Sequence, residues 1–324
     1  MMEAPVGDEQ RGEDPTTRAL EDAAASLMGH DDAVFLPSAT MANQIALFVQ
    51  TKPGDAVIVH RHAHLVLNEL GASAVHSGLM TFELESEDGH LDLDQVELLF
   101  ESRTSIYSPI PRLISIENSH NASGGQVLGA TYTRAVADLS KRHGAAFHVD
   151  GARLLNAAVA LGVEPRDLAD CADSVTLCLS KGLGCPVGAL LVGRQDVVAS
   201  ARRAKHLFGG AMRQSGVLAA AGLYALEHNI GRLHNDHARA RRLADGWAAA
   251  GIPAAPERVV TNFLQIDATS RRSSRDEMLG SLRDVGVLVS PTAGFGKLRA
   301  VTHLDVTETD VNYALSAGAS ALSP

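Results

Sequence analysis

Lys181 has surroundings unlike those of an ordinary surface lysine. It follows the apolar run from Ser174 to Leu179, which predicts a buried strand, and a turn rich in Gly and Pro comes next. A lysine at the end of a buried strand costs free energy unless it is paired or used chemically, and Schiff-base formation with an aldehyde cofactor is one such use. A lysine with a buried stem and a solvated amine is the alternative. The other four lysines, Lys205 among them, stand in polar or basic company and are expected at the surface.

Asp150 ends a second predicted strand, about thirty residues before Lys181. Pyridoxal phosphate acts as an electron sink only while its ring nitrogen stays protonated, and a carboxylate at a strand end can ensure that. In open parallel sheets such residues gather at the carboxyl ends of the strands. An Asp in this place is also a common helix cap. The strand-end Asp and the strand-end Lys together favour a pyridoxal-phosphate site.

Further polar groups follow other predicted strands. Ser38-Ala39-Thr40 opens a helix, where backbone N–H groups and hydroxyls suit a phosphate, although an ordinary N-cap explains the same residues.

The run His60-Arg61-His62-Ala63-His64 is expected to place three histidines on one strand face. His64 is the candidate to stack on a cofactor ring, with a hydrogen-bonded structural histidine as the alternative. No carboxylate lies in register, so no metal site is expected. Glu117 and His120 end another strand at the same edge of the sheet.

The composition indicates a globular protein that binds neither nucleic acid nor membranes. Its 324 residues exceed one typical core, so one large and one smaller domain are expected. The net charge of −10 argues against a nucleic-acid or acidic-membrane partner. No apolar run reaches the roughly 18 residues of a membrane helix, and the acidic first segment excludes a secretory signal. The three cysteines form no CxxC pair, so a reducing cytoplasm fits best and disulfides are not expected.

Strands and helices alternate along most of the chain. Strands are predicted at 33–36, 56–59, 113–117, 147–150, 174–180 and 187–192, with helices at 16–28, from 40, at 131–142 and from 153. Repeated β-α units with apolar, β-branched strands predict a parallel or mixed sheet covered on both faces. A long helix at 232–250 leads to a segment with strands at 263–267 and 298–302. We therefore divide the chain into an arm (1–15), a large domain (16–230) and a small C-terminal domain (231–324).

The chain resembles the β-eliminating lyase family of fold-type-I pyridoxal-phosphate enzymes, and within it the low-specificity L-threonine aldolases. Ordered motifs carry the resemblance: VGD and GEDPT at 6–16, LPSATMANQ at 36–44, AHL at 63–65 with Glu69, ENSH at 117–120, HVDGAR at 148–153, LCLSKGLGCPVG at 177–188, RRAK at 202–205, GGAMRQ at 209–214 and RAVTHLD at 299–305. The resemblance implies an α/β fold of the fold-type-I transferase kind. In this fold a large domain has a mostly parallel central sheet covered by helices, and a smaller C-terminal α+β domain follows.

The resemblance also implies an activity and assigns residues to the cofactor, pyridoxal 5'-phosphate. The activity is that of a carbon–carbon lyase, which cleaves L-threonine, L-allo-threonine or a related β-hydroxy-α-amino acid to glycine and an aldehyde. Lys181 would form the Schiff base, and Asp150 would pair with the pyridine nitrogen. His64 would stack on the ring, and Ser38, Ala39 and Thr40 would hold the phosphate.

Further implied roles concern the substrate. Arg153, which also belongs to the cofactor set, would bind the substrate carboxylate together with Arg299, for which a planar guanidinium is suited. His120 would meet the β-hydroxyl. His64, His120 or a water that they position would take the hydroxyl proton. A homodimer or homotetramer is implied, with an N-terminal arm too irregular and polar to pack on its own domain and Arg11 near a neighbouring site.

The sequence departs from the family pattern in three places. The segment that usually carries a substrate-binding serine precedes the first residue here, Arg11 stands where a tyrosine is usual, and Ala39 stands where a glycine is usual. The phosphate turn must therefore adopt a conformation that an alanine tolerates. Two alternatives stay open. One is another reaction of the same cofactor: transaldolation onto a biosynthetic aldehyde, β-elimination or transamination. The other is a weakly active cofactor-binding protein.

Overall fold

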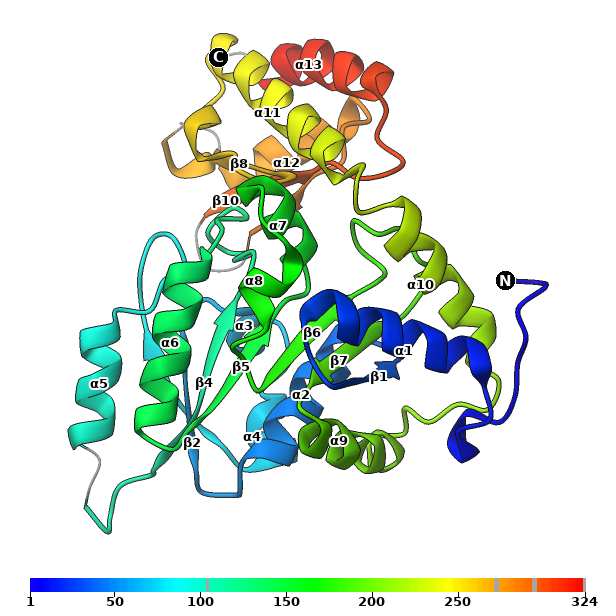
Figure 1. Ribbon diagram of the computed structural model, residues 1–324. Coiled ribbons are helices and arrows are strands. Elements are labelled where there is room, and N and C mark those ends of the chain that lie inside the picture. The colour runs from blue at the N-terminus through cyan, green and yellow to red at the C-terminus, as the bar shows by residue number, and fades with distance from the viewer. Residues whose placement is uncertain (103–104, 271–273, 293–295, 323–324) are drawn as a thin grey trace.

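A seven-stranded sheet forms the centre of the protein in the computed structural model, which describes residues 1–102, 105–270, 274–292 and 296–322 (Figure 1). The strand order is β1-β7-β6-β5-β4-β2-β3. All strands except β7 run in the same direction, and β7 is antiparallel to both neighbours. The bounds are β1 (Asp32–Leu36), β2 (Ala56–His60), β3 (Met80–Leu84), β4 (Pro111–Glu117), β5 (Ala146–Asp150), β6 (Ser174–Cys178) and β7 (Ala189–Gly193).

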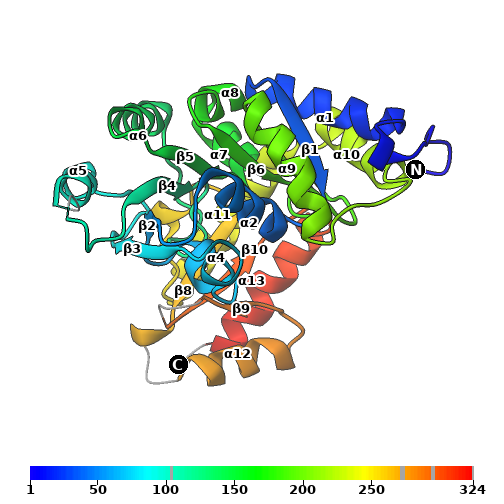
Figure 2. The same cartoon turned by 90° about the horizontal axis from the view of Figure 1, so that it is seen from below.

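Helices cover both faces of this sheet (Figures 1 and 2). Successive strand residues point to opposite faces, so Phe35 packs in the core under one helical layer and Val34 in the core under the other. The first layer comprises α1 (Pro15–Met28), α5 (Leu93–Ser102), α6 (Ala130–Arg142), α7 (Leu154–Leu161), α8 (Pro165–Ala169) and α10 (Gly216–His228). The second comprises α2 (Ala39–Gln50), α4 (Ala72–Ser77) and α9 (Gln195–Leu207). The expected mostly parallel sheet with helices on both faces is confirmed.

A small antiparallel sheet lies beyond the carboxyl edge of the large one (Figure 1). Its strand order is β8-β10-β9, and its own hydrophobic core surrounds Trp247. The Trp247 indole N–H donates a hydrogen bond of 3.0 Å to the carbonyl of Ala314. The elements are α11 (Leu233–Ala249), β8 (Phe263–Asp267), α12 (Arg275–Asp284), β9 (Ser290–Pro291), β10 (Lys297–Val301) and α13 (Glu308–Leu322). Across the described ranges, every helix is too short or too polar to cross a lipid bilayer.

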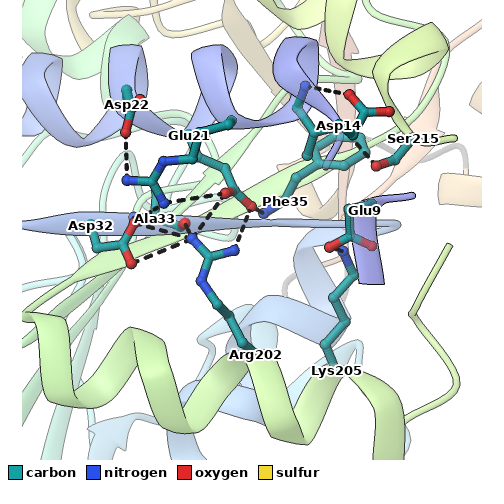
Figure 3. A network of polar contacts seen from close by, with 12 residues as sticks. Glu9, Asp14, Glu21, Asp22, Asp32, Ala33, Phe35, Arg202, Lys205 and Ser215 are labelled. Atoms are coloured by element: carbon teal, nitrogen blue, oxygen red, sulfur yellow. Dashed lines mark hydrogen bonds and ion pairs between the residues drawn. The ribbon is translucent and has the colours of Figure 1, made fainter. Parts of the chain in front are cut away.

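The N-terminal arm packs against its own chain, contrary to expectation. Lys205 on α9 is only 1% exposed, and its amine donates a hydrogen bond of 2.8 Å to Glu9 in the short 3-10 helix Glu9–Arg11 (Figure 3). Asp8 pairs with Arg213 at 2.7 Å. The surface location expected for Lys205 is therefore wrong as well. The buried ammonium is tolerated because the arm supplies a carboxylate, and that partner is too distant in sequence for a local pattern to reveal.

Arg202 on α9 connects this helix to α1 and to the edge strand β1 (Figure 3). Its guanidinium binds both carboxylate oxygens of Glu21 on α1, at 3.1 and 2.9 Å. It also donates to Asp32 at 3.1 Å and to the carbonyl of Ala33 at 2.6 Å. A bidentate pair of this kind is geometrically specific. Arg202 therefore joins α9, α1 and β1, although α1 and α9 cover opposite faces.

We predict that Lys205→Met destabilises the protein by about 3 kcal/mol, because the variant keeps the volume of the side chain but leaves the partly buried carboxylate of Glu9 without its cation. The free energy of unfolding in urea measures the effect. The exposed Lys141→Met should change it by less than about 0.5 kcal/mol. Adding Glu9→Gln to Lys205→Met should recover part of the loss. Equal urea midpoints for Lys205→Met and the parent would contradict a structural role for this pair.

Candidate active site

Polar side chains from several strands meet at one edge of the large sheet. Because the strands are parallel, their carboxyl ends share this edge. Ser38 follows β1, His64 follows β2, Glu117 ends β4, Asp150 ends β5 and Lys181 follows β6. Glu117 and Asp150 are direct partners in the register of β4 and β5. The strand directions therefore bring together residues that lie far apart in sequence.

Asp150 is a buried carboxylate with a hydrogen-bond donor on each oxygen. Its Oδ1 accepts from the backbone N–H of Ala152 at 3.1 Å, as a helix-capping aspartate would. Its Oδ2 accepts from the side-chain amide of Asn43 on α2 at 2.8 Å. The two donors, one from the backbone and one from α2, hold the carboxylate in one direction at the end of β5.

Lys181 lies in the turn after β6, which ends at Cys178 and not at Ser180 as expected. Burial lowers the pKa of the Lys181 amine, and the positive charge of Arg153 lowers it further. Within the described part of the chain, the amine makes no hydrogen bond and no ion pair. A half-buried amine with a lowered pKa is the form required for Schiff-base chemistry.

The expectation of three histidines on one strand face is wrong, because β2 ends at His60. There the chain turns: the backbone N–H of His62 donates to His60 Nδ1 at 3.1 Å, and His64 begins the short helix α3 (His64–Leu67). The backbone N–H of His64 donates to Glu117 at 2.7 Å, and its Nδ1 lies 2.8 Å from Glu69. Two carboxylates thus fix His64, one through its backbone and one through its ring.

Glu69 was not assigned a role from the sequence. The chain folds it back onto α2, where its oxygens accept from Asn43 at 2.9 Å and Gln44 at 2.6 Å. Its hydrogen bond raises the pKa of His64. His64, Glu69 and Asp150 have potential ligand atoms within 4.8 Å of one another, the one such group in the described ranges. That no metal binds there stays a prediction.

Glu117 links the large sheet to the small one. It is buried and accepts from the backbone N–H of Asn121 at 2.8 Å, in addition to that of His64. Burial raises the pKa of Glu117 to about 7, and the negative charge of Asp150 contributes to the rise. The side-chain oxygen of Asn121 in turn accepts from Arg299 on β10. A continuous set of hydrogen bonds therefore runs from His64 to the small domain.

Arg153 and Arg299 share the aromatic ring of Phe263, a residue the sequence suggested only as part of a strand. The guanidinium carbons lie 4.5 and 5.3 Å from the ring centroid. Burial, followed by the charge of Arg299, lowers the pKa of Arg153 to about 10. Among the described residues, neither arginine forms an ion pair with a carboxylate. Two guanidinium groups without an acidic partner suit an anionic ligand, and the ring stabilises them through cation–π contacts.

His120 packs against His60 at the end of β2. Its side chain is fully buried, its Nδ1 lies 2.9 Å from Ser123 Oγ, and its ring packs edge-on against His60 at a centroid distance of 4.4 Å. A Cβ at Gly89 would come within 2.5 Å of the ring, so the neighbouring turn lies directly against it. The expected contact of His120 with a β-hydroxyl stays a prediction.

The Ser38-Ala39-Thr40 turn forms the N-terminus of α2. Ser38 caps the helix by accepting from the backbone N–H of Met41 at 3.2 Å. Ala39 is the first helical residue, so the turn adopts a conformation that alanine tolerates. Ser38 and Thr40 line an open groove of about 590 Å³. A helix N-terminus with hydroxyls beside a groove suits a phosphate, and this assignment stays a prediction.

The sequence and the fold are similar to those of known proteins over nearly the whole chain. The family model for Beta-eliminating lyase matches residues 1–299. Low-specificity L-threonine aldolase 1 of Arabidopsis thaliana is 39% identical over 98% of this chain and 89% of its own length. Low specificity L-threonine aldolase of Escherichia coli (strain K12) is 41% identical over 95% of this chain and 89% of its own length.

Solved structures share the fold. The threonine aldolase of Leishmania major has a TM-score of 0.82 and 22% identity, with coverage of 98% of this chain and 92% of the other. A structure of SPT with a PLP internal aldimine has a TM-score of 0.75 and 18% identity, with coverage of 98% and 79%. The expected fold class is therefore confirmed.

We predict that acid destabilises the protein between about pH 6.5 and pH 4. Burial lowers the pKa of His60, His120 and His148 to about 4, against 6.5 in the unfolded chain. The unfolded chain therefore binds more protons in this window, and stability falls as the pH falls. His60 illustrates the cause. Its Nε2 faces the carbonyl of Ser86 and its Nδ1 accepts from the His62 N–H, so a proton added to Nδ1 would face a donor and not an acceptor.

The free energy of unfolding, measured from pH 7 to pH 4, checks this expectation. His60→Gln should lose less stability over the window than the parent, whereas the exposed His206→Gln should follow the parent curve. Parallel curves for all three proteins would contradict the proposed source of acid sensitivity.

Proposed function

This chain belongs to the beta-eliminating lyase family, and we propose that it is a pyridoxal-phosphate-dependent aldolase. It would cleave L-threonine, L-allo-threonine or a related β-hydroxy-α-amino acid to glycine and an aldehyde. One observation carries the proposal. The low-pKa amine of Lys181, the buried carboxylate Asp150 and the arginines without acidic partners belong to a single strand-end cluster.

The residues at this edge fit the cofactor. Lys181 would bind its aldehyde carbon, Asp150 would face its ring nitrogen, His64 would lie on its ring, and Ser38 to Thr40 would hold its phosphate at the N-terminus of α2. When bound, the cofactor supplies a conjugated system that accepts the electrons of a breaking bond. The protein supplies orientation, charge and exclusion of water.

Arg153 and Arg299 would orient the substrate. A carboxylate held between two guanidinium groups has a fixed direction, and this direction sets which bond at Cα stands perpendicular to the cofactor ring. Phe263 would keep both guanidinium groups in place, because each already packs against its ring. Cleavage of the Cα–Cβ bond, as opposed to loss of the Cα proton, follows from that orientation.

His64 is the side chain best suited to take the hydroxyl proton. Its Nδ1 is engaged by Glu69, which leaves Nε2 as the position where a proton can arrive. The same hydrogen bond raises the pKa of His64, so the ring is a stronger base than a free imidazole. His120 has no comparable carboxylate partner, and its ring is enclosed.

We further propose a homodimer or homotetramer in the cytoplasm. The N-terminal arm gives no argument for assembly, since it packs on its own chain. The support comes from Val75 and Leu207, which are 77% and 70% exposed and line the groove that holds Ser38 and Thr40. Exposed apolar side chains beside a site mark a contact surface. The free cysteines Cys171, Cys178 and Cys185 are in keeping with a reducing compartment.

The division into an arm, a large domain at 16–230 and a small domain at 231–324 is also retained as a proposal. The hydrophobic core around Trp247 supports it, because this core is separate from the clusters that pack on the large sheet. The boundary at 230 falls between α10 and α11.

We predict that Lys181→Ala abolishes both the visible absorbance of the purified protein and the release of aldehyde from L-threonine. The amine is the proposed covalent anchor, so its loss removes the cofactor bond and the reaction together. The exposed Lys141→Ala serves as the control and should keep both properties. Detection of glycine with an aldehyde, and of no keto acid, separates the aldolase from a transaminase. A Lys181→Ala protein that borohydride still fixes to the cofactor would show that another lysine is used.

We predict that Val75→Glu with Leu207→Glu weakens assembly and activity together, because the two charges would be buried in the subunit contact. Sedimentation over a dilution series, run beside the aldehyde assay, measures both properties. A fully active monomer would contradict the proposed assembly.

A further inference from the structure

A single amide donates to two of the buried carboxylates at the proposed cofactor site, Asp150 and Glu69. Asn43 lies on α2 and is buried. Its Nδ2 donates to Asp150 Oδ2 at 2.8 Å and to Glu69 Oε1 at 2.9 Å. Glu69 Oε1 in turn lies 2.8 Å from His64 Nδ1. An amide nitrogen carries two hydrogens, and here both are used, one for each carboxylate.

Buried partners behind Asn43 fix the direction of this amide. Asn43 Oδ1 lies 3.2 Å from His148 Nε2, and His148 Nδ1 lies 2.9 Å from Ser174 Oγ. Gln50 Nε2 donates to the same Oγ at 2.8 Å. Because Nδ2 faces two acceptors, Oδ1 must accept, and His148 Nε2 must carry the hydrogen. Ser174 then donates to His148 Nδ1 and accepts from Gln50, so every donor in the series meets an acceptor.

The state of His148 agrees with this assignment. The ring is completely enclosed, and burial lowers its pKa to about 4. A neutral imidazole with its hydrogen on Nε2 is the form that the series requires. A flipped Asn43 amide would point its oxygen at two carboxylates and its NH₂ at an N–H, which costs free energy at each contact.

We propose that Asn43 is a positioning residue, which holds Asp150 and the Glu69–His64 pair at one fixed separation. The ring nitrogen and the ring face of the cofactor would then be engaged together, and His148 would set the direction of the amide. This inference rests on the proposed function. It differs from a purely structural role, in which the amide only satisfies buried carboxylates.

The test uses two signatures of the holoenzyme that do not depend on turnover. The pH midpoint of the visible absorbance band reports the contact of Asp150 with the ring, and Asp150→Asn gives the reference shift. The titration of His64, followed by NMR, reports its contact with Glu69. Asn43→Ala should move both signatures and weaken cofactor binding by about tenfold to a hundredfold, because two hydrogen bonds to charged groups are lost.

Gln44→Ala is the matched control, since Gln44 is buried on the same helix and donates to Glu69 but not to Asp150. It should move the His64 titration and leave the band midpoint where it is. If Asn43→Ala does not fold, His148→Gln is measured in its place, and it should move both signatures in the same direction by a smaller amount.

Two results would overturn the proposal. One is an Asn43 variant with lowered unfolding free energy but with unchanged cofactor affinity and band midpoint. The other is a parent protein that forms no visible band with pyridoxal phosphate, which would remove the proposed function as well. A parent that binds the cofactor but releases no aldehyde would contradict the proposed function alone, because both signatures remain measurable.

Discussion

The common direction of the strands is the constraint on which the rest of the site depends. Parallel strands are buried on both faces, so polar side chains can leave the core only where strands end. The register of β4 and β5 then sets Glu117 directly beside Asp150. Two carboxylates so placed repel each other, and the pKa of Glu117 rises to about 7 as a result of burial and of that charge. The surrounding donors, from α2 and from the backbone of His64, offset this repulsion.

The same edge is where the small domain is attached to the site. Arg299 comes from β10 and Phe263 from β8, yet both act on groups of the large domain. The contact between Asn121 and Arg299 continues the hydrogen bonds of Glu117. Under the proposed function, one set of contacts would therefore serve both substrate orientation and cofactor binding, although the residues come from two sheets.

Residues at strand ends could be predicted from sequence because a local pattern reports them. The apolar run before Lys181 and the short strand before Asp150 are visible without any knowledge of partners, and β8 has the predicted bounds. The expectation of three histidines on one strand face was wrong because it assumed that β2 continues beyond His60. The edge strand β3 was missed, although Met80–Leu84 alternates apolar and polar residues as a half-exposed strand does.

Residues whose role depends on distant partners could not be predicted. Lys205 has a surface-like neighbourhood in sequence and is buried only because Glu9 reaches it. Asn43 and His148 likewise acquire their roles from each other. A signal for Asn43 was present, because Asn and Gln interrupt an otherwise apolar helix face, and buried polar residues are rarely without a reason.

Helix α2 limits which sequence changes this protein can tolerate. Its first turn carries the Ser38 cap, and Asn43 follows a little more than one turn later on the same rigid element. An insertion between them would rotate Asn43 by about 100° and shift it by about 1.5 Å, and so separate the two ends of the site. Under the proposed function, new substrate preferences are accessible through β8 and β10, which carry Phe263 and Arg299. Directed evolution for other aldehydes should concentrate its libraries there and keep α2 constant.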